Sequence, residues 1–351
     1  MKAVTERHVS VMPQEVLDHL DVTPGEWYVD CTFGAGGHAR RVLELGGRVL
    51  GIDQDPSVAE EVERDPYWRR AAASGTFRFA HGNFRDLETL AYEQGVREAR
   101  GVLMDLGVSS MQLDEEGRGF AFRHDGPLDM RMHGEGESAA DVVNDYPVEE
   151  LAAIIFRYGE DRYSRRIARR IAEARESAPI LTTRQLAEVV ASAYPPGPRR
   201  EHPARRTFQA LRIHVNDELG ALREGLEGAS RLLVPGGRLV VLSYHSLEDR
   251  IVKQFIAAAS RPGAETARLP LRESERPQPV LASVGRVLPS EAEIQANPRA
   301  RSAVLRVAER THVALPAEGG RAFLKMPEAP AGRRRQPART RTPRAQSFAC
   351  A

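Results

Sequence analysis

The sequence contains only two cysteines, Cys31 and Cys350, which lie near opposite ends of a chain of 351 residues. This scarcity excludes a disulfide scaffold and a cysteine-rich metal site, and we predict no bound metal. No apolar run is long enough to cross a membrane, and residues 1–14 lack the apolar core of a signal peptide. We therefore expect a cytoplasmic protein in a reducing compartment, with no attachment to a membrane.

Negative charge is scarce at one end of the chain. Residues 312–351 contain eight Lys or Arg side chains and only two acidic ones, although the whole protein has a net charge of +1. This basic tail is rich in Pro, Ala and Arg and shows no hydrophobic periodicity, so we predict that it is disordered. It can bind phosphate groups without reading a sequence, or serve only as a solubilising extension. Both interpretations stay open.

One glycine-rich stretch dominates what the sequence does contain. An apolar run at 27–29 leads into Asp30-Cys31-Thr32-Phe33-Gly34-Ala35-Gly36-Gly37-His38, and an amphipathic segment follows. This order predicts a strand, a tight turn and a helix, where glycines let a ligand approach the backbone and helix amides face it. Asp53 follows Gly34 by 19 positions, at the end of the next apolar strand, where a carboxylate can hold a ribose diol. The stretch therefore predicts an adenosine-type cofactor.

Apolar runs alternate with helical patterns as far as about residue 110. From there to about residue 214 only helical patterns occur, and strands then return, with a helix at 246–258 that Ser246 and Asp249 are expected to cap. The predicted strands are 27–29, 49–52, 76–80, 101–106, 238–243, 281–287 and 302–308. The predicted helices are 37–46, 56–65, 85–95, 148–158, 163–176, 183–193 and 246–258.

This alternation predicts an α/β fold with a doubly wound, Rossmann-like parallel sheet that has helices on both faces. A helical insertion interrupts the sheet after its fourth strand. We place the sheet domain at residues 1–110 and 216–311, the helical insertion at 111–215 and the basic tail at 312–351. The insertion is long enough to be a small domain of its own.

The glycine turn alone leaves the cofactor open, because Gly34-x-Gly36-x-x-Ala39 also satisfies the dinucleotide fingerprint. Asp30 favours S-adenosylmethionine, since an acid at the end of the first strand suits a cationic amino group and repels a pyrophosphate. Phe84 follows the third strand and Asp105 ends the fourth, so both are expected at the same crevice as the glycine turn. There Phe84 can stack near adenine, although it can also be a core aromatic and Asp105 a loop cap.

The stretches Asp105-Leu106-Gly107-Val108-Ser109-Ser110 and Gln112-Leu113-Asp114 make the chain similar to a known family. It closely resembles the bacterial ribosomal RNA small subunit methyltransferase H family, also called the MraW family. One departure is Met111, where the family usually has proline. The resemblance covers residues 8–311, and its matching segments are His8–Glu15, Asp30–His38, Asp53–Pro56, Asp105–Asp114, Arg118–Arg131, His202–Glu218, Ser243–Lys253 and Asn297–Arg310.

The resemblance implies a class I S-adenosylmethionine-dependent methyltransferase that methylates N4 of a cytosine in the decoding region of 16S ribosomal RNA, in the small ribosomal subunit. It implies that the 111–215 insertion recognises RNA. Among the cofactor-binding residues, it implies that Asp53 holds the ribose. It also implies that Gly36, Gly37 and His38 hold the methionine end and that Phe84, Asp105 and Gln112 hold the adenosine region. Together with Asp30 and Gly34 from the glycine-rich stretch, these residues are the predicted cofactor site.

Cytosine N4 is a poor nucleophile because its lone pair is delocalised into the ring. Methyl transfer requires acceptors that draw the amino group out of conjugation and align it with the methyl group. We hypothesise that Asp105 or Ser109 accepts the amino hydrogens, and that Tyr244-His245-Ser246 stacks the base or takes the proton. The alternative for His245 is a hydrogen-bonding residue at the start of a helix. The predicted catalytic residues are thus Asp105, Ser109 and His245.

Arginines of the insertion are suited to RNA phosphates, or alternatively to a solvated helix face paired with Glu173 and Glu176. These arginines are Arg165, Arg166, Arg169, Arg170, Arg205 and Arg206. Three other functions remain open at this point. They are a methyltransferase acting on DNA or protein, a nicotinamide-dependent oxidoreductase, and a non-catalytic RNA-binding module.

Overall fold

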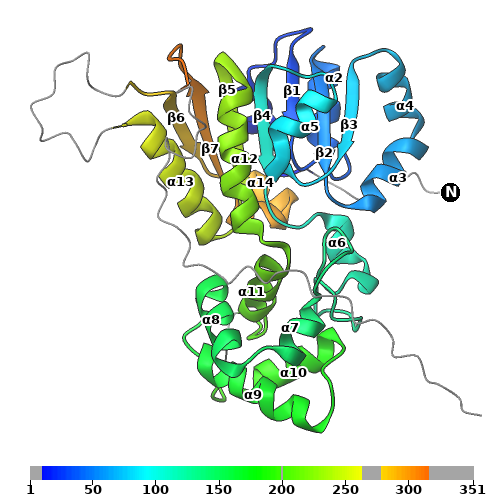
Figure 1. The fold of residues 1–351 in the computed structure, drawn as a ribbon, viewed down its shortest axis with the longest axis vertical. Helices are drawn as coiled ribbons and strands as arrows, with labels where there is room; N and C mark the ends of the chain where they lie inside the picture. Colours follow the sequence, from blue (N-terminus) through cyan, green and yellow to red (C-terminus); the bar gives the residue numbers. More distant parts are fainter. Residues whose placement is uncertain (1–9, 199–200, 263–277, 316–351) are drawn as a thin grey trace, which may run out of the picture.

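The computed structural model describes residues 10–198, 201–262 and 278–315. At its centre lies a seven-stranded sheet with the order β3-β2-β1-β4-β5-β7-β6 (Figure 1). Strands β1 to β5 run parallel, whereas β7 is antiparallel to both β5 and β6. The strands are β1 (Trp27–Asp30), β2 (Arg48–Asp53), β3 (Phe77–His81), β4 (Ala99–Asp105), β5 (Leu233–Ser243), β6 (Leu281–Val287) and β7 (Val304–Arg310). The predicted doubly wound α/β sheet is confirmed, except that the sheet is mixed because β7 is antiparallel. The order reverses beside β1, which is where such sheets bind ligands.

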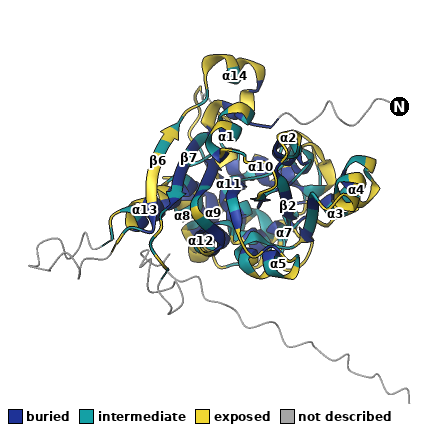
Figure 2. Cartoon of the chain, turned by 90° about the horizontal axis from the view of Figure 1, so that it is seen from above, coloured by how far each residue is buried: buried dark blue, intermediate teal, exposed yellow. Residues whose placement is uncertain are grey.

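Successive side chains of the buried strands point to opposite faces of the sheet and belong to two hydrophobic clusters, one on each face. In β4, Val102 and Met104 join the cluster formed with α5, α12 and α13, whereas Leu103 joins the cluster formed with α1 to α4. In Figure 2 the strands β2 and β7 are mainly dark blue, while β6 at the edge is largely exposed. The helices on the sheet are α1 (Pro13–Leu20), α2 (Gly37–Glu44), α3 (Pro56–Arg64), α4 (Pro66–Ala73), α5 (Leu87–Glu93), α12 (Glu218–Leu232) and α13 (Ser246–Ser260).

A second group of helices lies between β4 and β5 in the chain and forms the lower lobe in Figure 1. Its own hydrophobic cluster is built from residues between Phe120 and Leu211. The predicted domain bounds of 111–215 stay a prediction, although this cluster lies within them. The elements are α6 (Ser110–Asp114), η3 (Glu116–Arg118), α7 (Ala139–Asp145), α8 (Val148–Gly159), α9 (Ser164–Ser177), α10 (Thr183–Ser192) and α11 (Arg205–Asn216).

Several local predictions were wrong or incomplete. The helix α4 was not predicted, and Asp65 caps it by accepting a hydrogen bond from the Tyr67 N–H. Strand β5 begins at Leu233 rather than at residue 238, because its pairing with β4 passes through an irregularity between Ala99 and Gly101. The short elements η2 (Phe84–Asp86), α14 (Glu291–Ala296) and η6 (Pro298–Ser302) complete the fold.

The start of α13 also differs from the prediction. His245, not Ser246, is the N-cap residue, and its partner in the capping box is Glu248 rather than Asp249. The basic tail lies outside the described residues apart from 312–315. Among the described helices, none combines the length and apolarity that a membrane crossing requires.

Candidate active site

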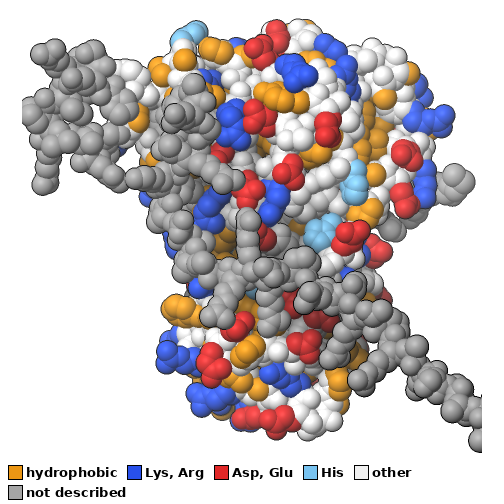
Figure 3. Space-filling view, in the orientation of Figure 1, with side chains coloured by type: hydrophobic (Ala, Val, Ile, Leu, Met, Phe, Trp, Pro, Cys, Tyr) orange, Lys and Arg blue, Asp and Glu red, His pale blue; other side chains and the backbone are white. Residues whose placement is uncertain are grey.

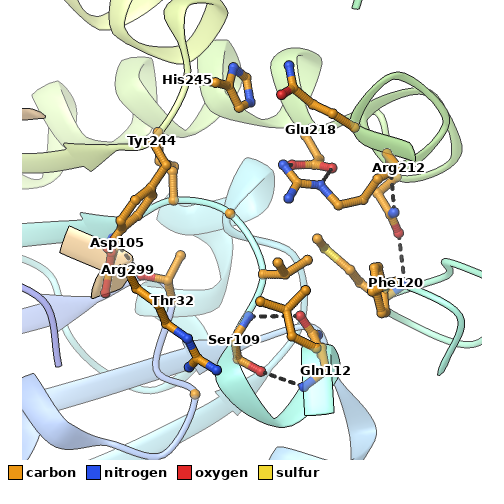
Figure 4. Close-up of a pocket in the computed structure, with 18 of the residues that line it drawn as sticks. Thr32, Asp105, Ser109, Gln112, Phe120, Arg212, Glu218, Tyr244, His245 and Arg299 are labelled. Atoms are coloured by element: carbon orange, nitrogen blue, oxygen red, sulfur yellow. Dashed lines mark hydrogen bonds and ion pairs between the residues drawn. The ribbon is translucent and has the colours of Figure 1, made fainter. Parts of the chain in front are cut away.

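A large cavity opens where the parallel strands end and the helical lobe begins. Its volume is about 1570 Å³, which exceeds the roughly 300–1,000 Å³ of a site for one drug-sized ligand. Loops after β1 to β5 form its floor, and segments of the helical lobe and η6 form its walls (Figure 4). The structure brings these predicted residues to its lining: Gly34, Gly37, His38, Asp53, Phe84, Asp105, Ser109, Gln112 and His245.

Two predicted cofactor residues, Asp30 and Gly36, are not part of the cavity lining. Gly36 has φ 73°, and a Cβ there would lie 2.2 Å from a ring carbon of Trp68. The packing of the turn therefore requires glycine at this position, and contact of Gly36 with a cofactor stays a prediction. Asp30 is buried behind the floor, where its carboxylate accepts a hydrogen bond from the Thr32 N–H. Burial raises the pKa of Asp30 to about 6, although the charge interaction with His38 lowers it.

Asp53 joins the glycine turn to the loop after β2. One carboxylate oxygen accepts the Gly34 N–H at 2.8 Å and the other accepts the Asp55 N–H at 2.9 Å. Burial raises the pKa of Asp53 to about 6, although both backbone hydrogen bonds act in the opposite direction. A Cβ at Gly34 would have only the Thr32 carbonyl within 4 Å, at 3.9 Å. The turn thus presents open backbone to the cavity beside a carboxylate.

Asp105 connects the loops after β1 and β5 at the cavity floor. Its Oδ1 accepts a hydrogen bond from the Tyr244 hydroxyl at 2.6 Å, and its backbone N–H donates to Thr32 Oγ1. The other oxygen, Oδ2, lies 3.6 Å from Nε2 of His38, whose side chain is only 6% exposed. Neither ring nitrogen of His38 has a hydrogen-bond partner among the described residues. Asp105 therefore keeps one oxygen available to a ligand, and its side chain is 19% exposed.

Ser109 and Gln112 are held by a capping box at the start of α6. Ser109 Oγ accepts the Gln112 N–H, and the Ser109 N–H donates to Gln112 Oε1 at 3.1 Å. The Gln112 amide then donates to Asp55, which also pairs with Arg118 at 2.8 Å. Met111 lies in the first turn, a position that also accepts proline. Gln112 thus uses its side-chain oxygen and one side-chain N–H to position the Ser109 loop. Both groups could otherwise bind a ligand.

His245 is occupied by its own helix start. Its Nδ1 accepts the Glu248 N–H, and its Nε2 lies 3.0 Å from Glu248 Oε1. A neutral imidazole whose Nδ1 accepts a hydrogen bond carries its hydrogen on Nε2, so neither nitrogen has a free lone pair. This arrangement favours the helix-start alternative for His245 over a role as proton acceptor. Burial would raise the pKa of Glu248, but the hydrogen bond from His245 and the charge of Arg212 hold it below its usual value.

Sequence reasoning missed an ion pair in the wall of the cavity. Arg212 donates to both oxygens of Glu218, at 2.8 and 3.0 Å, across the corner between α11 and α12. Asp217 makes this corner with φ 45°, a left-handed conformation. Their spacing of six positions fits no single helix face, so the sequence pattern does not predict the pair. The one hint in the sequence is that both residues lie in the segment His202–Glu218, which resembles the family.

Five exposed arginines line the rim of the cavity: Arg123, Arg205, Arg206, Arg299 and Arg301. Arg205 pairs with Glu201, and Arg299 lies 3.5 Å from Asp114, but such exposed pairs contribute little. Of the six arginines predicted to bind RNA, only Arg205 and Arg206 line the cavity. Those of α9 lie in the lower lobe, where acidic and basic side chains are interspersed in Figure 3. There Arg170 pairs with Glu173, as the solvated-face alternative expects.

Within the part of the chain that the structure describes, no three His, Cys, Asp or Glu side chains form a group that could hold a metal ion. The cavity floor is acidic through Asp53 and Asp105, and its rim is rich in arginine. Such a site can hold a cationic ligand at its floor and a polyanion at its mouth.

Residues 5–311 match the sequence profile of the MraW methylase family. Three similar curated proteins are described as "Ribosomal RNA small subunit methyltransferase H". Identity to the Deinococcus deserti protein is 54% over 306 residues, covering 87% of this chain and 94% of that protein. The Deinococcus radiodurans protein is 51% identical, with 87% and 90% covered. The Methylorubrum populi protein is 52% identical, with 88% and 89% covered.

Similar solved structures are much more distant. An rRNA methylase from Streptococcus thermophilus has 12% identity and a TM-score of 0.37, with 85% of this chain and 93% of that chain covered. A putative methyltransferase from Streptococcus mutans, in complex with SAH, has 11% identity and a TM-score of 0.36, with 86% and 99% covered.

Proposed function

The chain belongs to the MraW methylase family, and we propose that it transfers a methyl group from S-adenosylmethionine to N4 of a cytosine in 16S ribosomal RNA. The observation that carries the proposal is the contrast between an acidic cavity floor and an arginine rim. A cationic methyl donor suits the floor, and the phosphates of RNA suit the rim. The family membership gives no support to a nicotinamide-dependent oxidoreductase.

The residues of the floor fit S-adenosylmethionine. The open backbone at Gly34 leaves room for a ligand, and Asp53 offers carboxylate lone pairs for ribose hydroxyls beyond its two backbone bonds. His38 lines the same cavity, and its ring nitrogens have no hydrogen-bond partner among the described residues, so they are suited to polar groups of the methionine end. When bound, the cofactor supplies an electrophilic methyl group.

The partly engaged carboxylate of Asp105 is the best placed acceptor for the amino group of cytosine. The Tyr244 hydroxyl fixes Oδ1 and so orients the carboxylate, which leaves Oδ2 to accept an amino hydrogen and then the proton that N4 loses. Ser109 Oγ, already held by the Gln112 N–H, has a second lone pair for the other amino hydrogen. Two fixed acceptors would hold the amino group out of conjugation with the ring.

The rim arginines are suited to RNA that delivers one extruded base. A target base has to leave its stack to reach a recessed pocket, and phosphate contacts then fix the register of the flanking chain. Arg205 and Arg206 start helix α11 on one wall, while Arg299 and Arg301 belong to η6 on another. We propose that the RNA crosses the mouth between these walls, as part of the small ribosomal subunit.

The test is methyl transfer from labelled S-adenosylmethionine to small subunits, naked 16S ribosomal RNA, DNA and ribosomal proteins. Label in the RNA, recovered as N4-methylated cytidine, supports the proposal, and label only in DNA or protein sinks it. Asp105→Asn should lower kcat by roughly 10²- to 10⁴-fold, far more than it changes S-adenosylhomocysteine affinity. Glu60→Gln, an exposed change on α3 outside the cavity, is the matched control and should keep the original kcat.

A further inference from the structure

Three aromatic rings on the helical side of the cavity contact one another in a series that runs from the core to the surface, and we call this series the aromatic stack. Phe208 of α11 is buried, Phe122 is half-buried, and His202 is exposed. The Phe122 and His202 rings are stacked, with centroids 4.5 Å apart and planes at 30°. Phe208 meets Phe122 edge to face at 5.0 Å. All three rings line the same cavity as Asp105 and Ser109.

The outer part of this stack is not explained by core packing. Phe208 belongs to the hydrophobic cluster of the helical lobe and Phe122 packs against it, so the core is closed before His202 is reached. His202 is nonetheless fixed, because its Nδ1 accepts the Ala204 N–H at 3.2 Å in the turn that leads into α11. An exposed ring held in place at the mouth of a cavity is a surface on which another flat group can stack.

The charges around the stack indicate the kind of group. Arg123 follows Phe122 directly, and Arg205 and Arg206 follow His202 by three and four positions. All three arginines are exposed at the rim. Arg206 is oriented by a hydrogen bond to the Glu160 carbonyl, and it has further donors for an anion. A flat group attached to a phosphate backbone matches this combination of rings and guanidinium groups.

We propose that Phe122 and His202 form a stacking platform for an unpaired base of the substrate RNA that flanks the target cytosine. The proposal rests on the proposed function, because it takes RNA as the occupant of the rim. The volume of about 1570 Å³ accommodates this second base beside the cofactor and the target base. The platform holds the flanking chain while the target base reaches the acceptors at the floor.

The direct test is binding of decoding-region RNA hairpins in which 2-aminopurine replaces one nucleotide beside a cytosine in turn. Stacking on an aromatic ring quenches its fluorescence, and this readout needs neither cofactor nor methyl transfer. The variants are Phe122→Leu, which keeps an apolar side chain for the cluster, and His202→Ala, which removes the exposed ring together with its hydrogen bond from the Ala204 N–H. The matched control is Phe156→Leu, because Phe156 of α8 is an aromatic that is 64% exposed and lies outside the cavity lining.

We expect quenching at one flanking position with the unaltered protein and with Phe156→Leu. Phe122→Leu and His202→Ala should remove that quenching and weaken RNA binding by roughly 5- to 150-fold, while S-adenosylhomocysteine binding stays unchanged. Equal quenching and affinity in all four proteins would overturn the platform and leave the proposed function standing. The reverse case, in which binding responds to the two variants but no methyl group reaches RNA, would remove the proposed reaction and keep the platform.

Discussion

Replacing Asp53 by Asn tests how the cavity floor holds the cofactor. Both oxygens of this carboxylate accept backbone N–H groups, from Gly34 at 2.8 Å and from Asp55 at 2.9 Å. An Asn side chain has only one oxygen, so its NH₂ group must face one of these two donors. The substitution also removes the negative charge that ribose hydroxyls would meet, and a hydrogen bond to a charged group contributes about 1.5–3 kcal/mol. We therefore expect S-adenosylhomocysteine to bind Asp53→Asn about 10- to 150-fold more weakly.

The pH dependence of that binding identifies the group. Burial raises the pKa of Asp53 to about 6, and ribose hydroxyls donate to the ionised form, so affinity is lost as the pH falls through that value. One pH unit below the pKa, binding should be about tenfold weaker. Acid unfolding through this group does not explain the loss. A carboxyl with a raised folded-state pKa stabilises the protein most below its unfolded pKa of about 3.9, and loses that contribution as the pH rises through the folded pKa.

The assay is calorimetric titration with S-adenosylhomocysteine over a pH range that brackets the pKa of about 6. Asp30→Asn is the informative second variant, because burial also raises the pKa of Asp30 to about 6 while that residue lies behind the floor. The loss of affinity at low pH should disappear in Asp53→Asn and persist in Asp30→Asn and in the Glu60→Gln control. An undiminished low-pH loss in Asp53→Asn would refute this account of the floor.

Two further predictions concern stability. Gly36→Ala places a Cβ 2.2 Å from the Trp68 ring at φ 73°, which should lower the free energy of unfolding by about 2–5 kcal/mol, measured by urea denaturation; an unchanged midpoint would contradict the packing role. Arg118→Met leaves the buried Asp55 carboxylate without its 2.8 Å partner and should cost about 3–5 kcal/mol at neutral pH. Burial would raise the pKa of Asp55, but its hydrogen bonds and Arg118 hold that pKa below the usual value. The stabilisation from ionised Asp55 is therefore present above its unfolded-state pKa and is lost as the pH falls through its folded-state pKa. The loss of stability in Arg118→Met should shrink in acid, and a loss that does not depend on pH would contradict this.

The sheet and the position of the site were predictable from the sequence because strand periodicity and turn glycines are local signals. Asp53 and Asp105 end buried strands that run parallel, so their meeting at one edge of the sheet follows from the topology. The predicted helical segments inside the insertion were confirmed for the same reason, as the bounds of α8, α9 and α10 show.

Side-chain partners were not predictable in this way. His245 turns onto Glu248 because that carboxylate is buried and needs donors, a fact that depends on the packing of α13. Gly36 faces Trp68 only because the unpredicted helix α4 folds over the turn. Arg299 and Arg123 are far apart in the chain, and only the fold brings both to one rim.

Mass spectrometry of 16S ribosomal RNA nucleosides tests the central claim most directly. In a strain that lacks this gene, N4-methylated cytidine should be absent from 16S ribosomal RNA and should return when the unaltered gene is restored. The Asp105→Asn gene should not restore it. An unchanged level of N4-methylated cytidine in the deletion strain would contradict the account.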